Sequence, residues 1–247
     1  MCLLIFQYRV VPEAPLLVGF NREEFFGRPA WPPRKVQDSP RVMCGIDRRA
    51  KGTWLGVNEH RLLVAVTNRL KARLPDAPRS RGLLCRDLLA TRSCEAAIAL
   101  AQTELAGNRY AGVNLICADP QRAAVVYGDD RIEVEDIQPG LHVITNDRLD
   151  DPSDPRQALA RSLINRQPPA SAEQFIEISR GVLATPSRPD GRPGIVLRAD
   201  DRGTVSSTLI AVTSAAESAR YLYASGPPDD HPYADLSHWL RDVLAGK

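Results

Sequence analysis

Short apolar segments, separated by proline, glycine, asparagine and aspartate, constrain the fold of this chain more than any other feature of its sequence. Residues 3–9 and 16–21 are joined through Pro12 and Pro15, which cannot continue a β-ladder, so they predict an N-terminal hairpin. Residues 62–66 are apolar at every position, which indicates a strand covered on both faces. We therefore expect buried antiparallel sheets.

The other elements follow from the same reasoning. Further strands are expected at 52–57, 61–68, 113–117, 123–127, 131–134, 141–146, 204–212 and 219–224. Helices are expected at 83–91, 94–106, 155–166, 172–184 and 236–244. The proline-rich segment 22–47 and the segment 186–194 are expected to be irregular. Hairpins alternating with helices predict an α+β fold, an αββα four-layer sandwich in a single domain over residues 1–247.

Composition limits the class of protein. With 43% hydrophobic and 25% charged residues, the chain is unlike a disordered protein, a collagen or a coiled coil. No apolar run approaches the ~20 residues of a membrane span, and the first apolar stretch stops at Gln7, so no membrane span and a cytoplasmic location are expected. The five cysteines include no CxxC pair, which favours reduced thiols, and no ligand cluster predicts a metal site.

Charge is distributed unevenly along the chain. Residues 22–92 hold 16 basic and 7 acidic side chains, although the net charge of the whole chain is only +2. This asymmetry fits a site for an anionic ligand and fits equally a solvated arginine-rich surface. The basic region has no interleaved aromatic residues, so we expect no nucleic-acid partner.

Cys2 is the first candidate for chemistry. Removal of Met1 would leave a thiol and a free α-amine on one residue. The α-amine has a pKa of about 7.7–8.0 and the thiol one of about 8.5, so the amine is able to act as the base for its own nucleophile. The alternative is a buried, inert cysteine at the start of the first strand.

Three further polar residues are candidates. Asn68 and Asn146 each follow a threonine at the end of an apolar strand, where the side-chain amide is able to donate to an oxyanion. The alternative interpretation is that each asparagine only ends its strand. The predicted hairpin returns Arg22 towards Cys2, where it would orient a reacting group or bind a carboxylate; the alternative is a surface ion cluster. His142 is expected in the core rather than as a partner of Asn146.

Six motifs occur in the order found in the NRDE family, also called the transport and Golgi organisation 2 family. They are Met1-Cys2, residues 19–29 (GFNREEFFGRP), 52–56 (GTWLG), 65–68 (AVTN), 112–115 (GVNL) and 140–146 (GLHVITN). The resemblance implies a fold of the N-terminal-nucleophile hydrolase type, similar to the cysteine amidases that cleave penicillin V and bile-salt conjugates. It also implies that Cys2 is the nucleophile, Arg22 the motif arginine, and Asn68 and Asn146 the oxyanion donors.

Two departures from the family pattern argue against catalysis. The motif aspartate is Glu23 here, and residues 204–208 (TVSST) lack an arginine that relatives carry. The resemblance further implies handling of haem or of lipid and acyl-CoA.

Our leading expectation is therefore a protein that handles an anionic amphipathic small molecule, haem or acyl-CoA, with haem as a bound ligand and no required cofactor. Its expected ligand-binding residues are Asn21, Arg22, Glu23, Glu24 and Trp54. No haem-ligating motif is present around the histidines. The alternatives are a Cys2-dependent amidohydrolase acting on a linear amide or thioester, and a module for protein interactions alone.

Overall fold

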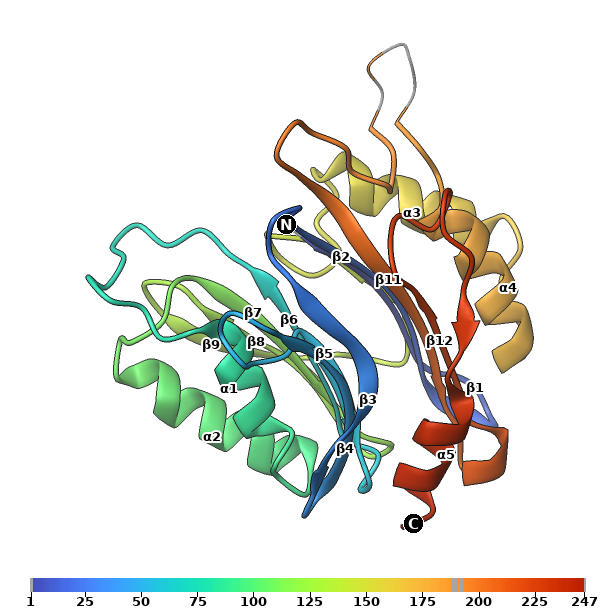
Figure 1. The fold of residues 1–247 in the computed structure, drawn as a ribbon, viewed down its shortest axis with the longest axis horizontal. Helices are drawn as coiled ribbons and strands as arrows, with labels where there is room; N and C mark the ends of the chain where they lie inside the picture. Colours follow the sequence, from blue (N-terminus) through green and yellow to red (C-terminus); the bar gives the residue numbers. More distant parts are fainter. Residues whose placement is uncertain (1, 188–190, 192, 247) are drawn as a thin grey trace. The chain divides into compact units, whose positions relative to one another are not determined.

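The computed structural model describes residues 2–187, 191 and 193–246. The chain divides into two compact units. Unit 1 comprises Met1–Gly27 and Pro139–His238, and unit 2 comprises Arg28–Gln138 and Trp239–Lys247. Each unit contains one antiparallel sheet with a pair of helices packed against it (Figure 1). The α+β class is thereby confirmed, whereas a single domain over residues 1–247 stays a prediction.

The sheet of unit 1 has six strands in the order β10-β1-β2-β11-β12-β13. Its elements are β1 (Leu3–Val11), β2 (Ala14–Phe25), β10 (Gly140–Ile144), α3 (Pro155–Asn165), α4 (Ala172–Leu183), β11 (Arg202–Val212), the short 3₁₀ helix η1 (Ala216–Ser218), β12 (Arg220–Ala224) and β13 (Ala234–Asp235). Asp154 caps α3 and Ser171 caps α4, each accepting backbone N–H groups of the first turn. These caps fix where both helices begin.

The core of unit 1 lies between the sheet and these two helices. Leu3 and Ile5 of β1 and Leu17 of β2 belong to one buried cluster with Phe175 and Leu183 of α4. A Cβ on Gly19 would lie 3.2 Å from Leu183 Cδ1, so glycine lets α4 approach β2 closely. Because side chains alternate along a strand, the odd-numbered residues from Leu3 to Ile5 and from Leu17 to Glu23 face the helices, and the even-numbered residues between them face the opposite side.

Unit 2 has a seven-stranded sheet in the order β3-β4-β5-β6-β7-β8-β9. Its strands are β3 (Ala30–Asp38), β4 (Arg41–Asp47), β5 (Leu55–Asn58), β6 (Leu63–Asn68), β7 (Val113–Ala118), β8 (Ala123–Gly128) and β9 (Ile132–Asp136), and its helices are α1 (Arg81–Leu88) and α2 (Cys94–Ala106). The chain ends with α5 (Ser237–Leu244). Residues 62–66 are buried at every position, as their sequence predicts.

Several boundaries differ from those expected. Residues 22–47 are not irregular but hold the end of β2 and the whole of β3 and β4. Pro32 and Pro33 fit because β3 is an edge strand and its register shifts between Trp31 and Arg34, where their missing N–H groups cost no ladder bond. The strand expected at 52–57 begins only at Leu55, since the Thr53 N–H donates to Gly82 O at 2.9 Å instead.

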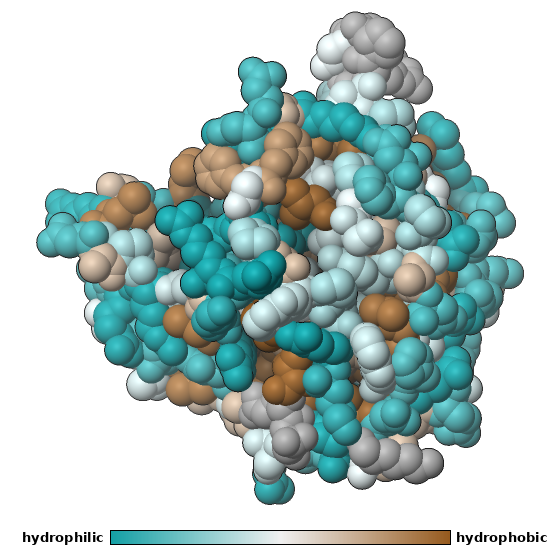
Figure 2. All heavy atoms as spheres, viewed as in Figure 1, coloured by the Kyte–Doolittle hydropathy of each residue, from teal (hydrophilic) through white to brown (hydrophobic). Residues whose placement is uncertain are grey.

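Smaller differences concern the ends of the chain and one loop. Leu236 precedes α5 rather than opening it, and η1 and β13 were not expected. Residues 188–190 and 192, within the loop expected at 186–194, lie outside the described residues. No helix in the described part of the chain is long and apolar enough to cross a membrane. The face drawn in Figure 2 is covered mainly by hydrophilic side chains.

Candidate functional site

Cys2 and Arg22 lie together at one end of the sheet of unit 1. The β1–β2 ladder ends with Leu3 opposite Asn21, so Cys2 and Arg22 follow as the next pair of residues. Both are buried, with 7% and 5% of their surfaces exposed. The sequence-based hairpin therefore brings these two candidates together as expected. Met1, whose removal would free the Cys2 amine, lies outside the described residues.

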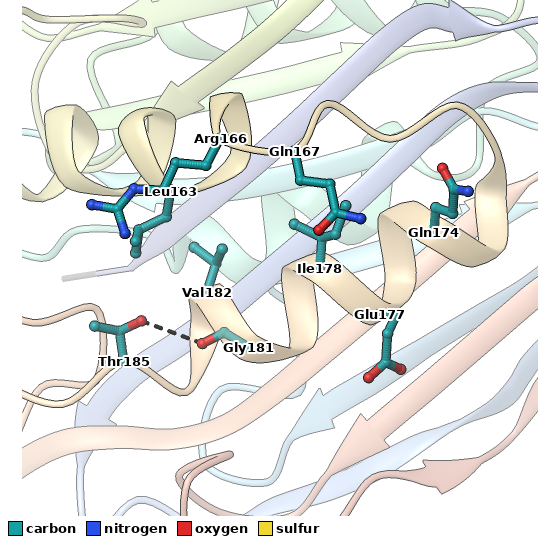
Figure 3. Close-up of a pocket in the computed structure, with 9 residues that line it drawn as sticks. All are labelled: Leu163, Arg166, Gln167, Gln174, Glu177, Ile178, Gly181, Val182 and Thr185. Carbon is teal, nitrogen blue, oxygen red and sulfur yellow. Dashed lines mark hydrogen bonds between the residues drawn. The ribbon is translucent and has the colours of Figure 1, made fainter.

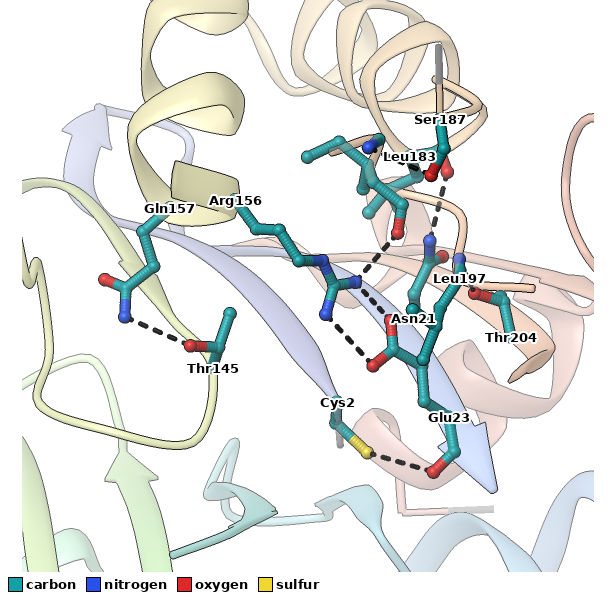
Figure 4. Close-up of polar contacts among 12 residues, drawn as sticks. Cys2, Asn21, Glu23, Thr145, Arg156, Gln157, Leu183, Ser187, Leu197 and Thr204 are labelled. Atoms are coloured by element: carbon teal, nitrogen blue, oxygen red, sulfur yellow. Dashed lines mark hydrogen bonds and ion pairs between the residues drawn. The ribbon is translucent and has the colours of Figure 1, made fainter. Parts of the chain in front are cut away.

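The Cys2 thiol is held in its neutral form. Burial raises the pKa of the thiol above its usual value, the charge of Glu23 adds to this rise, and the positive charge of Arg22 opposes it. The sulfur lies 4.0 Å from the backbone carbonyl oxygen of Glu23, towards which its S–H points (Figure 4). At neutral pH the site thus contains a thiol beside a cation.

The Asn21-Arg22-Glu23 motif is divided between the two faces of β2. Asn21 Nδ2 donates to Leu183 O of α4 at 3.0 Å. Both carboxylate oxygens of Glu23 accept from Arg156 of α3, with Arg156 Nη1 to Glu23 Oε2 at 3.1 Å (Figure 4). Arg22, between them, points to the opposite face, which is the face of Cys2. Asn21 and Glu23 therefore anchor the helices, and only the backbone of Glu23 reaches Cys2.

Arg156 is a residue that sequence reasoning missed. It lies in the first turn of α3, 133 positions from Glu23, and also donates to Ile195 O at 2.9 Å. The Glu23 side chain is 1% exposed and that of Arg156 is 14% exposed. Burial raises the pKa of Glu23, and the charge and hydrogen bonds of Arg156 oppose the rise. No local signal in the sequence pairs these two residues.

Two hydroxyl groups, also missed, accompany Arg22. Ser206 of β11 lies opposite Arg22 in the ladder, after a register shift between Thr204 and Ser206. It is 2% exposed. Burial raises the pKa of the nearby Tyr223, while a hydrogen bond with Ser206 and the positive charge of Arg22 oppose that rise. We call Cys2, Arg22, Ser206 and Tyr223 the Cys2 cluster.

Asn146 lies near the same end of the sheet, but not in a strand. The ladder between β1 and β10 ends with Leu4 opposite Ile144; Leu4 is two residues from Cys2, and Ile144 is two residues from Asn146. The expected strand 141–146 is shorter because Thr145 leaves the ladder, its hydroxyl donating to Asp154 and accepting from Gln157 Nε2 at 3.3 Å. Asn146 is half-buried in the bend that follows.

The remaining predicted site residues are Asn68 and Trp54 in unit 2 and Glu24 on β2. Asn68 ends β6 in unit 2, opposite Val113, and Trp54 of the same unit is 7% exposed. The convergence of Asn68 and Trp54 with Cys2 stays a prediction. Glu24 forms an ion pair with Arg22 at 4.0 Å.

His142 is not the core residue that was expected. It lies on the edge strand β10, half-buried, with its Nδ1 2.7 Å from Asp150 Oδ2. Asp150, and not Asn146, is therefore its partner, since a carboxylate at this distance is able to accept from the ring N–H.

A groove of about 430 Å³ lies elsewhere in unit 1, between α3 and α4. Figure 3 shows its lining residues on these two helices and just beyond each of them. None of the predicted site residues lines it. In the described part of the chain, no group of three or more His, Cys, Asp or Glu side chains is placed to hold a metal ion.

Solved structures share this fold. The Caenorhabditis elegans ortholog of N-acylethanolamine-hydrolyzing acid amidase matches with a TM-score of 0.56 and 14% identity, over 85% of this chain and 92% of that one. A variant of conjugated bile acid hydrolase from Clostridium perfringens matches with a TM-score of 0.55 and 13% identity, over 96% and 93%. The fold is therefore of the N-terminal-nucleophile hydrolase type, as the resemblance implied.

Sequence comparisons identify the family. A Transport and Golgi organization protein 2 homolog from Bos taurus is 28% identical over 251 residues, covering 86% of this chain and 88% of the relative. The Homo sapiens homolog is 30% identical over 164 residues, covering 62% of this chain and 59% of the relative. The family model described as Transport and Golgi organisation 2 matches residues 1–219. Because that match spans most of the chain, the protein belongs to the transport and Golgi organisation 2 family.

Proposed function

We propose that this protein binds and handles an anionic amphipathic small molecule, haem or acyl-CoA, in the cytoplasm, with the Cys2 cluster as the site for its anionic group. One observation carries the proposal: a buried cation, Arg22, lies beside a neutral thiol and two hydroxyls, with the Glu24 carboxylate 4.0 Å away as its acidic neighbour. A buried guanidinium favours a carboxylate or phosphate, which it is able to bind with two parallel hydrogen bonds.

Ser206 supports the same assignment. Its buried hydroxyl lies opposite Arg22 in the ladder and beside Tyr223, so it is placed next to the proposed anion. An anionic oxygen held by Arg22 would accept from this hydroxyl. Haem and acyl-CoA both combine such anionic oxygens with a large apolar body, and they are the ligands that the family resemblance implies.

Ligand titration tests the proposal. Purified protein is titrated with haem, followed by absorbance, and with a long-chain acyl-CoA, followed by calorimetry. Arg22→Gln is expected to weaken the bound ligand about 10- to 100-fold, because hydrogen bonds to charged groups contribute about 1.5–3 kcal/mol. Arg166→Gln, an exposed arginine beyond α3, is the matched control and should bind normally. No saturable binding of either ligand would overturn the proposal, and equal effects of both substitutions would remove Arg22 from the site.

A second candidate function is a Cys2-dependent amidohydrolase, favoured by the position of Cys2 beside Arg22 at the sheet end that Asn146 also approaches. After loss of Met1, the Cys2 sulfur would attack the carbonyl carbon of an amide or thioester while its proton passes to the Cys2 α-amine. Asn146 would donate to the oxyanion, the role that the family resemblance also implies for Asn68. The amine or thiol would then leave with the proton, and water would hydrolyse the acyl-cysteine.

Intact mass and two variants separate the two functions. A chain that retains Met1 has no free amine on Cys2, which would exclude this mechanism. If Met1 is absent, wild type, Cys2→Ser and Cys2→Ala are compared on a panel of linear amides and thioesters. Turnover by the wild type that both substitutions abolish would establish the hydrolase, and turnover that survives Cys2→Ala would refute it. The raised pKa of Cys2 predicts slow turnover at neutral pH.

A further inference from the structure

The Trp31 ring in unit 2 is surrounded by three cations. The Arg34 guanidinium carbon lies 4.5 Å from the ring centroid, that of Arg48 lies 5.6 Å away, and Lys51 Nζ lies 5.4 Å away. Arg34 comes from the same strand, β3, while Arg48 and Lys51 come from the segment between β4 and β5. The ring itself is 37% exposed. We call these four residues the Trp31 patch.

The positive charge of the patch is not balanced by nearby acids. None of its three cations forms an ion pair with a carboxylate among residues 2–187, 191 and 193–246. Asp47, the adjacent acid in sequence, accepts instead from Arg28 Nε at 2.6 Å and from the backbone N–H groups of Arg49 and Ala50. Three like charges gathered around one ring therefore attract an external anion.

The exposure of the patch indicates the kind of anion. Arg34, Arg48 and Lys51 are all exposed, in contrast to the buried Arg22, so they do not enclose a small ligand. The strand that carries Trp31 and Arg34, β3, is the edge strand of its sheet. A half-exposed tryptophan among basic side chains suits a bilayer surface, where the indole ring lies at headgroup level and each basic residue strengthens binding to anionic lipid about fivefold.

We propose that the Trp31 patch binds the anionic headgroups of a lipid bilayer, so that the protein docks peripherally on membranes. Arg34, Arg48 and Lys51 contact lipid phosphates and carboxylates, and the Trp31 ring enters the interface. Three cations at about fivefold each give a preference of about 100-fold for an anionic over a neutral bilayer. The proposal is independent of the ligand bound at the Cys2 cluster.

Vesicle co-sedimentation of the full chain tests this proposal. Vesicles of phosphatidylcholine alone are compared with vesicles of phosphatidylcholine and phosphatidylserine in equal parts. Binding is expected only to the mixed vesicles, with a blue shift of tryptophan fluorescence. It should fall as salt shortens the screening length from about 10 Å at 0.1 M to about 3 Å at 1 M. Trp31→Ala should remove the blue shift.

Two triple variants supply the control. Arg34→Gln/Arg48→Gln/Lys51→Gln should weaken binding about 100-fold. A second triple variant makes the same loss of charge at exposed arginines elsewhere in unit 2: Arg73→Gln, Arg92→Gln and Arg131→Gln. It should bind as the wild type does. Urea unfolding checks that both variants fold. Equal binding to both vesicle types, equal loss in both triple variants, or binding of inorganic polyphosphate without vesicle binding would overturn the proposal.

Discussion

The ion pair between Glu23 and Arg156 provides the sharpest test of how this sheet end is built. Glu23 is 4% exposed, and Arg156 is the cation that its two carboxylate oxygens contact. Arg156→Leu would leave a buried carboxylate without its ion partner. Breaking a buried pair from one side costs about 3–5 kcal/mol, because the remaining charge keeps its desolvation penalty. We expect a loss of that size in the free energy of unfolding at pH 8.

The pH dependence of the variant follows from the direction of the pKa shift. The pKa of Glu23 is already raised by burial in the wild type, and removing Arg156 takes away the main opposing effect. A folded-state pKa above the unfolded value means that the folded protein binds the extra proton. Stability is then fully present below the unfolded pKa and is lost as the pH rises through the folded pKa. The deficit of Arg156→Leu should therefore shrink from pH 8 to pH 5, by at most about 1.4 kcal/mol per pH unit.

Urea denaturation at pH 5 and pH 8 measures both effects. The double variant Glu23→Gln/Arg156→Leu removes the buried charge together with its partner and should recover most of the lost stability at pH 8. It should also lose the pH dependence. If the deficit of Arg156→Leu is the same at both pH values, and the double variant is no more stable than the single one, the reasoning about a buried, uncompensated Glu23 is refuted.

Three further predictions concern stability and reactivity. Ser93→Ala removes the hydroxyl that accepts from the Ala96 N–H at the start of α2 and should lower the free energy of unfolding in urea by about 1 kcal/mol. Thr103→Ala inside the same helix is the control and should be nearly neutral, and an unchanged stability of Ser93→Ala would contradict the capping role of Ser93. Gly52→Ala would place a Cβ 2.1 Å from the backbone carbonyl carbon of Gly82 in α1 and should lower the free energy of unfolding by about 1–3 kcal/mol or more. A Cβ on Gly27 would have no atom within 4 Å, so Gly27→Ala should leave the stability unchanged. All five cysteines are buried, so Ellman's reagent should react slowly with the folded protein, whereas after denaturation it should titrate five thiols. Rapid reaction of the folded protein at neutral pH would contradict the burial of the thiols and the raised pKa of Cys2.

Signals from neighbouring residues, such as N-caps and apolar runs, predict the helices. Ser93 as N-cap and the apolar run behind it predicted residues 94–106, which are the bounds of α2. Pro32 and Pro33 misled the prediction for β3, because proline excludes a central strand but not an edge strand with a register shift. Strand order decides between these cases, and it arises from pairing between segments far apart in the chain.

The candidate site was predictable only where it depends on neighbouring strands. The N-terminal hairpin placed Arg22 beside Cys2 because a single turn joins the two strands. Ser206 reaches the same cluster through the pairing of β2 with β11, and its register includes a shift that no local pattern encodes. The resemblance to the family indicated that an arginine is missing from residues 204–208, but only the ladder shows that a serine hydroxyl lies opposite Arg22.

The alternation of side chains along β2 explains why one short motif serves two purposes. Asn21 and Glu23 face the helices and hold Leu183 and Arg156, so their substitution should act on the stability of unit 1. Arg22 faces the opposite side with Cys2, so its substitution should act on binding as well as on stability. Side chains along a strand return to the same face every two residues. The position of Arg22 is therefore tied to the positions of Asn21 and Glu23. The motif therefore fixes the position of the cation by the same contacts that attach the helices to the sheet.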